Sequence, residues 1–273
     1  MTTTPPCQLI ATDIDGTLLR SDGTVSDRAR RAIADVEDSG RLFVLVTGRP
    51  PRWLRPITEQ VAHRGLAICA NGGIVMDLHT EEVVRVDAFP DGVGLDVLNR
   101  LRAMDDTLTF GVEWADGFAH EASYPRGTRS SELARGAAQD VGHVDELFVR
   151  PVVKVLARAQ DRGRLALDEL AERAIAEIGE LATVTWSSVG LLEVSAPAVT
   201  KAAALHRFAE DHGLGAEDVL AFGDMPNDLP MIEWAGHGVA VANAHQLVRA
   251  VADEVTDSND DDGVAKVIER VLG

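Results

Sequence analysis

The sequence predicts an α/β protein, in which a parallel sheet covered by helices on both faces is interrupted by an inserted domain of mixed helices and strands. In the first and last thirds of the 273 residues, short apolar segments alternate with amphipathic ones. This alternation is expected of strands buried on both faces and of the helices that connect them. The middle third contains several strand-like segments in succession and only two helix-like segments. A chain of this length forms one large domain or two smaller ones.

The first third of the chain supplies the first half of the predicted core. The expected elements are a strand at 9–14, a helix at 26–40, a strand at 42–48, a helix at 49–65, and a strand, glycine turn and second strand over 66–77. Ser26 is placed to cap the first helix, and Gly40 is placed to end it. Pro50 or Pro51 lies in the first turn of the second helix, where a missing amide hydrogen is tolerated.

The middle of the chain has a different pattern from its two ends. It contains strand-like segments at 83–89, 108–114, 118–123, 146–158 and 183–188, and helix-like segments at 93–104 and 161–178. The last third alternates again, with strands at 191–196, 219–224 and 237–242, helices at 200–212 and 227–235, and two short helices after them. The sequence therefore predicts core residues 1–82, an inserted α+β domain at 83–189, and core residues 190–273.

The charge balance argues against several kinds of partner. A formal net charge of −18 repels nucleic acid and anionic lipid, and no apolar segment approaches the roughly 20 residues of a membrane span. The amino-terminal MTTTPPCQ has no basic region and no long apolar segment, unlike a signal peptide. Cys7 and Cys69 allow at most one disulfide and form no framework. We expect a cytoplasmic protein that is a monomer or a homodimer.

Asp13 and Asp15 follow the apolar start of the first predicted strand. Residues i and i+2 of a strand point to the same face, so both carboxylates leave the strand side by side if it persists that far. Ligands of open parallel sheets bind beyond the carboxyl ends of the strands. A divalent cation makes two adjacent carboxylates tolerable, and Mg²⁺ bridges such oxygens to phosphate. One aspartate can then act as an ionised nucleophile while the other holds a proton. The structural alternative is an ordinary Asp-Gly turn.

Similar groups follow other predicted strands. They are Thr47, Gly48 and Arg49 after the second strand, Lys201 at the start of a helix, and Asp224 and Asp228 after the strand at 219–224. Taken singly, each has a structural alternative, such as a loop, a helix cap or a solvated lysine. Together they offer carboxylates for a cation and a hydroxyl and a lysine for a phosphate. The sequence therefore predicts a magnesium-dependent phosphate site at one edge of the sheet.

Four segments, in order, resemble the signatures of phosphatases of the haloacid dehalogenase (HAD) superfamily, Cof type (subfamily IIB, C2-capped). They are DIDGTLL, VTGR, the lysine of VTKAAAL, and GDMPNDLPMI. ANGG, GVAVANA and SNDDDGVA resemble further segments of the Cof type. The resemblance covers the core from Leu9 onward, whereas the insert matches only in length and position. It implies a Rossmann-like HAD core with an inserted α+β cap of the C2B type.

The resemblance also implies a reaction and assigns residues to it. The expected activity is Mg²⁺-dependent hydrolysis of small phosphorylated metabolites, such as sugar phosphates. Asp13 would attack phosphorus and form an aspartyl-phosphate, and Asp15 would protonate the leaving oxygen and then activate water. The implied metal ligands are Asp13, the Asp15 backbone carbonyl, Asp224 and, in or next to the shell, Asp228. The implied phosphate-binding groups are Thr47, Gly48, Lys201, Asn227 and the amides after Asp13.

The cap would close over the site and select the substrate. Arg49, which follows a motif, and the insert residues Arg126 and Lys154 are the candidate substrate contacts. The chain departs from the family pattern at Ala198 and Ala202, where glycine is usual. A positive φ at either position would strain alanine and alter the placement of the lysine between them.

Three alternatives remain for the activity. A phosphosugar mutase of the same superfamily also keeps both aspartates, and dependence on a bisphosphate activator would identify it. A phospho-ligand-binding regulator would carry the same motifs around an inactive site. A phospho-acceptor signalling domain needs neither a second aspartate nor so long an insert. A transport ATPase is excluded, because it lacks the aspartate at the position of Asp15 and needs membrane helices.

Overall fold

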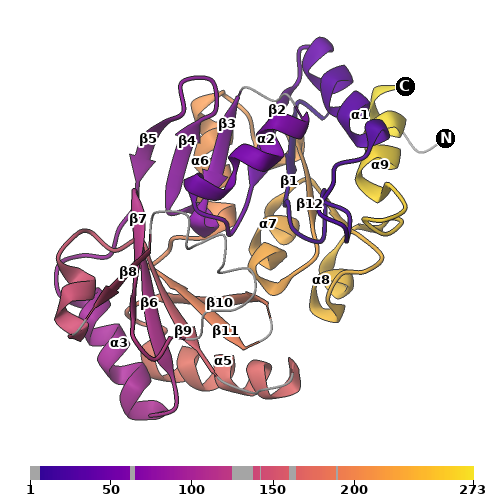
Figure 1. Cartoon of the computed structure of the whole chain (residues 1–273). Coiled ribbons are helices and arrows are strands. Elements are labelled where there is room, and N and C mark those ends of the chain that lie inside the picture. The colour runs from indigo at the N-terminus through magenta and orange to yellow at the C-terminus, as the bar shows by residue number, and fades with distance from the viewer. Residues whose placement is uncertain (1–6, 62–64, 125–137, 142, 160–163, 189) are drawn as a thin grey trace.

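The computed structural model describes residues 7–61, 65–124, 138–141, 143–159, 164–188 and 190–273. These residues form the predicted α/β core and an insert built on a second sheet (Figure 1). The described residues include no helix long and apolar enough to cross a membrane. Cys7 and Cys69 are both buried, and both thiols are free.

The core sheet has eight strands in the order β14-β13-β12-β1-β2-β3-β4-β5. In chain order they are β1 (Leu9–Thr12), β2 (Leu42–Val46), β3 (Leu66–Cys69), β4 (Ile74–Asp77), β5 (Glu82–Val86), β12 (Val219–Gly223), β13 (His237–Ala240) and β14 (Glu254–Val255). β1 is central and pairs in parallel with β2 and β12, so that Leu9 is level with Leu42 and Val219. The carboxyl ends of β1, β2, β3 and β12 therefore meet at one edge of the sheet.

Two groups of helices cover the core sheet. One group is α1 (Asp27–Asp38), α2 (Arg55–Val61) and α9 (Gly263–Leu272); the other is α6 (Lys201–Asp211), α7 (Leu229–Trp234) and α8 (Gln246–Val251). α1 packs against α2 and α9, and α7 packs against α6 and α8 (Figure 1). Right-handed crossovers run in opposite directions from β1, which places the two groups on opposite faces. Ser26 caps α1 by accepting a hydrogen bond from the Ala29 amide at 3.0 Å, as predicted.

The insert has a six-stranded sheet in the order β10-β11-β9-β6-β7-β8. Its strands are β6 (Thr109–Trp114), β7 (Gly117–Glu121), β8 (Ala138–Val141), β9 (Lys154–Arg158), β10 (Thr183–Ser188) and β11 (Leu191–Ser195). α3 (Val93–Met104) and α5 (Arg164–Ile178) pack on one face of this sheet, where Phe110 and Val112 enter a shared apolar core. Alternation along β6 then directs Glu113 to the opposite face, toward the core domain.

The chain passes from the core sheet to the sheet of the insert, and back again, later in the sequence than predicted. β5, expected in the insert, pairs with β4 and forms the edge of the core sheet. β11, expected in the core, lies between β10 and β9 in the insert. An apolar segment shows that a strand is present but not which sheet it joins, because the partner is chosen by tertiary packing.

Smaller differences occur at element boundaries. β1 ends at Thr12, two residues short of the predicted strand. The segment predicted as a strand from residue 146 begins as the 3₁₀ helix η3 (Val144–Phe148), and β9 starts only at Lys154. The predicted second helix is split into the 3₁₀ helix η1 (Pro51–Trp53) and α2. The two-residue strand β14 was not predicted.

Candidate active site

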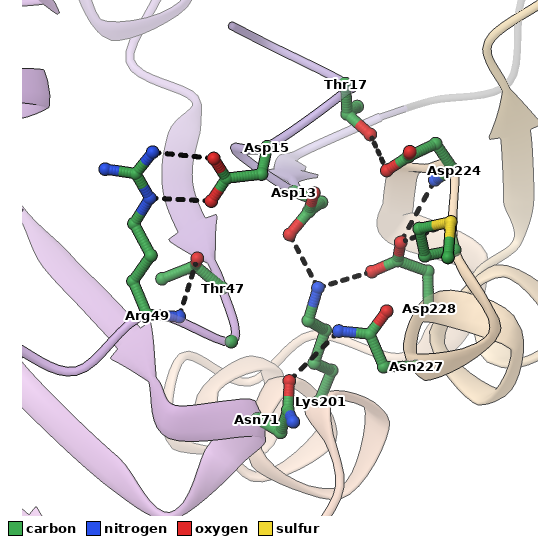
Figure 2. Close-up of polar contacts among 12 residues, drawn as sticks. Asp13, Asp15, Thr17, Thr47, Arg49, Asn71, Lys201, Asp224, Asn227 and Asp228 are labelled. Carbon is green, nitrogen blue, oxygen red and sulfur yellow. Dashed lines mark hydrogen bonds and ion pairs between the residues drawn. The ribbon is translucent and has the colours of Figure 1, made fainter. Parts of the chain in front are cut away.

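The loops after β1, β2 and β12 and the start of α6 bring the predicted site residues of the core together at the carboxyl edge of the core sheet (Figure 2). Asp13 directly follows β1 and is 5% exposed. Its Oδ1 accepts a hydrogen bond of 2.6 Å from Lys201 Nζ. Lys201 is the first residue of α6, where Thr200 caps the helix through the Ala203 amide. The helix start thus aims the lysine at the end of β1.

Lys201 also contacts Asp228, which follows β12. Lys201 Nζ donates to Asp228 Oδ1 at 2.6 Å, and Asp228 Oδ2 accepts from the amides of Asp224 and Met225 at 3.0 Å each. Burial alone would lower the pKa of Lys201, but the carboxylates of Asp13 and Asp228 raise it above its ordinary value. The lysine is therefore a fixed positive charge inside the protein.

Asp224 completes the acidic group. Its Oδ1 accepts a hydrogen bond of 2.9 Å from Thr17 Oγ1. Gly16 has φ +80°, and a Cβ there would lie 2.5 Å from Asp224 Oδ2, so this position requires glycine. The close approach holds the turn after β1 against the loop after β12.

We name Asp13, Asp224, Asp228 and Lys201 the acidic cluster. One oxygen from each of its aspartates lies within 4.8 Å of the others, and all three residues are buried. Burial raises the pKa of Asp13 well above its ordinary value, opposed by Lys201 and reinforced by Asp228 and Asp224. Burial, together with Asp228, raises the pKa of Asp224 to about 7. One ammonium does not neutralise three buried carboxylates, and an oxygen-preferring divalent cation fits this donor set.

The strand does not persist to Asp15, which was the condition for Asp13 and Asp15 to leave it side by side, although the Asp15 charge still helps to raise the pKa of Asp13. Because β1 ends at Thr12, the chain turns before Asp15, and the Asp15 carboxylate faces Arg49 instead. Arg49 Nε and Nη2 each donate to one Asp15 oxygen at 2.6 Å. Arg49, predicted as a substrate contact, is therefore the partner of Asp15 in this structure.

Thr47 and Gly48 follow β2 at the same edge of the sheet. Thr47 is buried, and its Oγ1 accepts a hydrogen bond of 3.1 Å from the Arg49 amide. A Cβ at Gly48 would lie 3.0 Å from Asn71 Oδ1 and 3.5 Å from Glu193 Oε1, so the turn is closely packed.

Asn227 lies between β12 and α7, and its Nδ2 donates to Asn71 Oδ1 at 3.0 Å (Figure 2). Asn71, in the turn after β3, was not predicted as a site residue. Two signals in the sequence could have found it: its place after a parallel strand, and the resemblance of ANGG to a Cof-type segment.

The insert reaches this site through a hydrogen bond from Lys154 and an ion pair of Glu113. Lys154 Nζ donates to Glu193 Oε1 and to the Gly48 carbonyl at 2.8 Å each, and its side chain is only 2% exposed. Arg52 pairs with Glu113 through two hydrogen bonds, of 2.6 and 2.9 Å. Lys154, predicted as a substrate contact, thus joins the insert to the turn after β2. Arg126, the other predicted contact of the insert, lies outside the described residues.

The two alanines that replace the family glycines differ in their backbone. Ala198 has φ +61°, so the left-handed conformation that glycine would favour is kept by alanine. Ala202 lies within the first turn of α6, where alanine is a favoured residue. Lys201 nevertheless reaches both Asp13 and Asp228.

Comparisons with known proteins agree with this fold and this site. Residues 10–268 match the family model of haloacid dehalogenase-like hydrolases. The chain is 32% identical to 5-amino-6-(5-phospho-D-ribitylamino)uracil phosphatase YcsE of Bacillus subtilis, over 96% of this chain and 94% of that protein. It is 28% identical to pyridoxal phosphate phosphatase YbhA of Escherichia coli, over 96% and 97% of the two chains. A haloacid dehalogenase-like hydrolase from Bacteroides thetaiotaomicron has the same fold, with a TM-score of 0.77, 28% identity, and coverage of 97% and 99% of the two chains.

The family match covers nearly the whole chain, and both relatives are phosphatases that align along their full length. The order of the four motifs predicted this family, and a mixed α/β core with an inserted second sheet is the fold that accompanies it. The chain belongs to the haloacid dehalogenase-like hydrolases and is a phosphatase.

Proposed function

We propose that the protein hydrolyses small phosphorylated metabolites through an aspartyl-phosphate on Asp13, with Mg²⁺ as cofactor. The observation that carries the proposal is the contact of Asp13 with Lys201 inside the acidic cluster. Asp13 is a buried carboxylate that accepts a hydrogen bond from a fixed cation, Lys201, at the point where a phosphoryl group would meet both. Asp13, the Asp15 backbone carbonyl, Asp224 and Asp228 would hold the Mg²⁺, which supplies charge neutralisation for the transferring phosphoryl group.

The proposed reaction has two steps, and Asp15 gives up a proton in the first and takes one from water in the second. An Asp13 oxygen attacks phosphorus, the bond from phosphorus to the leaving oxygen breaks, and Asp15 gives that oxygen its proton. In the second step Asp15 takes a proton from water as the water oxygen attacks phosphorus. The Asp13–phosphorus bond then breaks and inorganic phosphate leaves. Lys201, Thr47, Gly48 and Asn227 are the groups proposed to position the phosphoryl oxygens, which is the main requirement of phosphoryl transfer.

Asp15 must change partners during this cycle. While Arg49 donates to both of its oxygens, Asp15 is held as a carboxylate, so it must be released and take a proton from water before it can protonate the leaving oxygen. Arg49 also lies beside Thr47, so an entering phosphate ester would compete with Asp15 for the guanidinium. We therefore propose that Arg49 contacts the substrate after it releases Asp15. The two free, buried thiols are compatible with the reducing conditions of the cytoplasm.

The test is phosphate release from a panel of phosphorylated metabolites, with and without Mg²⁺. The panel includes sugar phosphates, pyridoxal 5′-phosphate and 5-amino-6-(5-phospho-D-ribitylamino)uracil, because relatives are named for the last two. Asp13→Asn should abolish release, while Asp27→Asn, on an exposed helix turn, should not. No release from any compound by folded wild type would contradict the proposal. Turnover that appears only with a bisphosphate activator would identify a mutase instead.

A further inference from the structure

The turn after β3 is the one part of the site edge to which the proposed mechanism assigns no role. It is the 3₁₀ segment η2 (Ala70–Gly72), and its backbone is unusual. Ala70 and Asn71 both have positive φ, +51° and +56°, so two consecutive residues other than glycine are left-handed. This conformation is strained in residues other than glycine, and strain of this kind concentrates at functional sites.

Close contacts hold the turn in this conformation. The Asn71 amide donates to the Thr47 carbonyl at 3.0 Å, and the Ala70 amide donates to the Arg49 carbonyl at 2.9 Å. On the other side, a Cβ at Gly72 would lie 2.3 Å from the Thr200 carbonyl, immediately before Lys201. The strained turn therefore lies between the loop after β2 and the start of α6, both of which carry proposed phosphate ligands.

The Asn71 side chain reaches the third phosphate ligand, Asn227. Asn71 is 2% exposed and Asn227 is 6% exposed, and their amides share one hydrogen bond, from Asn227 Nδ2 to Asn71 Oδ1. Within the described parts of the chain, Asn71 Nδ2 and Asn227 Oδ1 have no hydrogen-bond partner. Figure 2 shows the Asn227 oxygen on the side of Asp228, away from Asn71. Buried amide atoms without partners are rare and costly, which indicates that a contact is still to be made.

A phosphoryl oxygen can only accept hydrogen bonds, so it needs the amino group of Asn227 and not its carbonyl oxygen. The terminal torsion of asparagine is broad and roughly two-fold. If both amides turn over together, Asn71 Nδ2 donates to Asn227 Oδ1, and Asn227 Nδ2 faces the acidic cluster. The pair keeps one mutual hydrogen bond in either arrangement. A phosphoryl group adds a bond only in the second arrangement and therefore selects it.

We propose that Asn71 is a positioning residue that sets which end of the Asn227 amide meets the phosphoryl group. The inference rests on the proposed function, since it concerns the phosphate site of that reaction. Only an asparagine can serve both arrangements, because its side chain both donates and accepts and because it tolerates a left-handed backbone.

The decisive variant is Asn71→Asp, which has the same shape and also tolerates positive φ. Its carboxylate can only accept, so it holds the Asn227 amino group away from the acidic cluster. We expect the Kd for inorganic phosphate in the presence of Mg²⁺, and the KM for substrate, to rise about tenfold. Asn71→Gly keeps the backbone conformation and leaves Asn227 free to turn, so it should raise both by only about threefold. A space-filling role for Asn71 predicts the reverse order, with glycine the more harmful change.

A double-mutant cycle separates positioning from the added negative charge. Calorimetric titration with inorganic phosphate is repeated for Asn71→Asp in an Asn227→Ala background. If Asn71 acts through Asn227, the tenfold effect should fall below about twofold. A tenfold effect that persists without the Asn227 amide would overturn the inference, because charge alone would then explain it. Thermal melting of each variant identifies any loss that comes from unfolding.

The inference and the proposed function fail in different ways. An active wild type whose phosphate affinity is unchanged by Asn71→Asp would overturn the inference alone. A wild type that binds phosphate but releases none from any ester would overturn the proposed hydrolysis alone. The phosphate titrations of the double-mutant cycle would still test the role of Asn71. A wild type that neither binds phosphate nor releases it from any ester would overturn both.

Discussion

The acidic cluster and the contacts around Arg49 and Arg52 differ in burial, although they lie at the same edge of the sheet. In the cluster, the exposed fractions of the Lys201, Asp13 and Asp228 side chains are 1%, 7% and 0%. Asp15 and Arg49 are 40% and 21% exposed, and Arg52 is 19% exposed although its partner Glu113 is only 4% exposed. Buried charges have no alternative partner, whereas half-exposed ones can exchange a partner for water or a ligand. We infer that the first region keeps one fixed arrangement, whereas the Asp15–Arg49 pair can change partners as a substrate enters.

Removal of the central cation should have the largest effect. Lys201→Met leaves three buried carboxylates without their ammonium, so we expect about 3–5 kcal/mol lower free energy of unfolding without metal. Loss of a fixed charge at the phosphoryl group should also lower kcat by about a thousandfold. Chemical denaturation and phosphate-release assays measure the two effects. Lys266→Met, which removes an exposed ion pair with Asp257, is the matched control and should change neither appreciably. Equal losses in the two variants would contradict the contrast between the regions.

Breaking a bridge between the domains should have a smaller effect of a different kind. Arg52→Gln removes the partner of Glu113, whose side chain is only 4% exposed, and should lower the free energy of unfolding by about 2–4 kcal/mol. Because this bridge lies outside the acidic cluster, KM should rise more than kcat falls. Arg55→Gln, which breaks the exposed pair with Glu59, should cost less than about 0.5 kcal/mol. A fall in kcat as large as that of Lys201→Met would show that the bridge belongs to the chemistry.

Proton and metal should compete for the acidic cluster. Folding raises the pKa of Asp224 from 3.8 to about 7, so the metal-free protein gains stability from this group below about pH 4 and loses it as pH rises through 7. Mg²⁺ binds the ionised form and should reverse that loss. We expect about tenfold tighter Mg²⁺ binding at pH 8 than at pH 6, and a larger increase in Tm on adding Mg²⁺ at the higher pH. Differential scanning calorimetry with and without Mg²⁺ measures this, and equal increases at both pH values would contradict it.

Of the two regions, the acidic cluster is the one that could be predicted from the sequence. Asp13, Lys201, Asp224 and Asp228 follow strands or begin helices, and a parallel sheet brings such positions to one edge whatever the loops do. The direction of Asp15 could not be predicted, because it depends on where β1 ends and on the turn at Gly16.

The other residues that escaped prediction depend on contacts between distant segments. The positive φ of Asn71 is held by hydrogen bonds to the loop after β2, which no local pattern encodes. Lys154 was predicted to face a substrate, but its register on β9 places it against Glu193 and Gly48. Motif position therefore predicted the acidic cluster and the family, whereas the interface between the domains required the structure.

The smallest expected effect concerns the two alanines on either side of the lysine. Ala198 has φ +61°, so Ala198→Gly should relieve about 1 kcal/mol of backbone strain and raise the Tm by about 2–3 °C. Ala202→Gly, in the first turn of α6, should instead cost about 0.5–1 kcal/mol. Lys201 already reaches both carboxylates with alanine at residue 198, so Ala198→Gly should leave kcat within about twofold. A large gain in kcat on Ala198→Gly would show that the alanine holds the lysine away from its catalytic position, and that the acidic cluster is less fixed than its burial indicates.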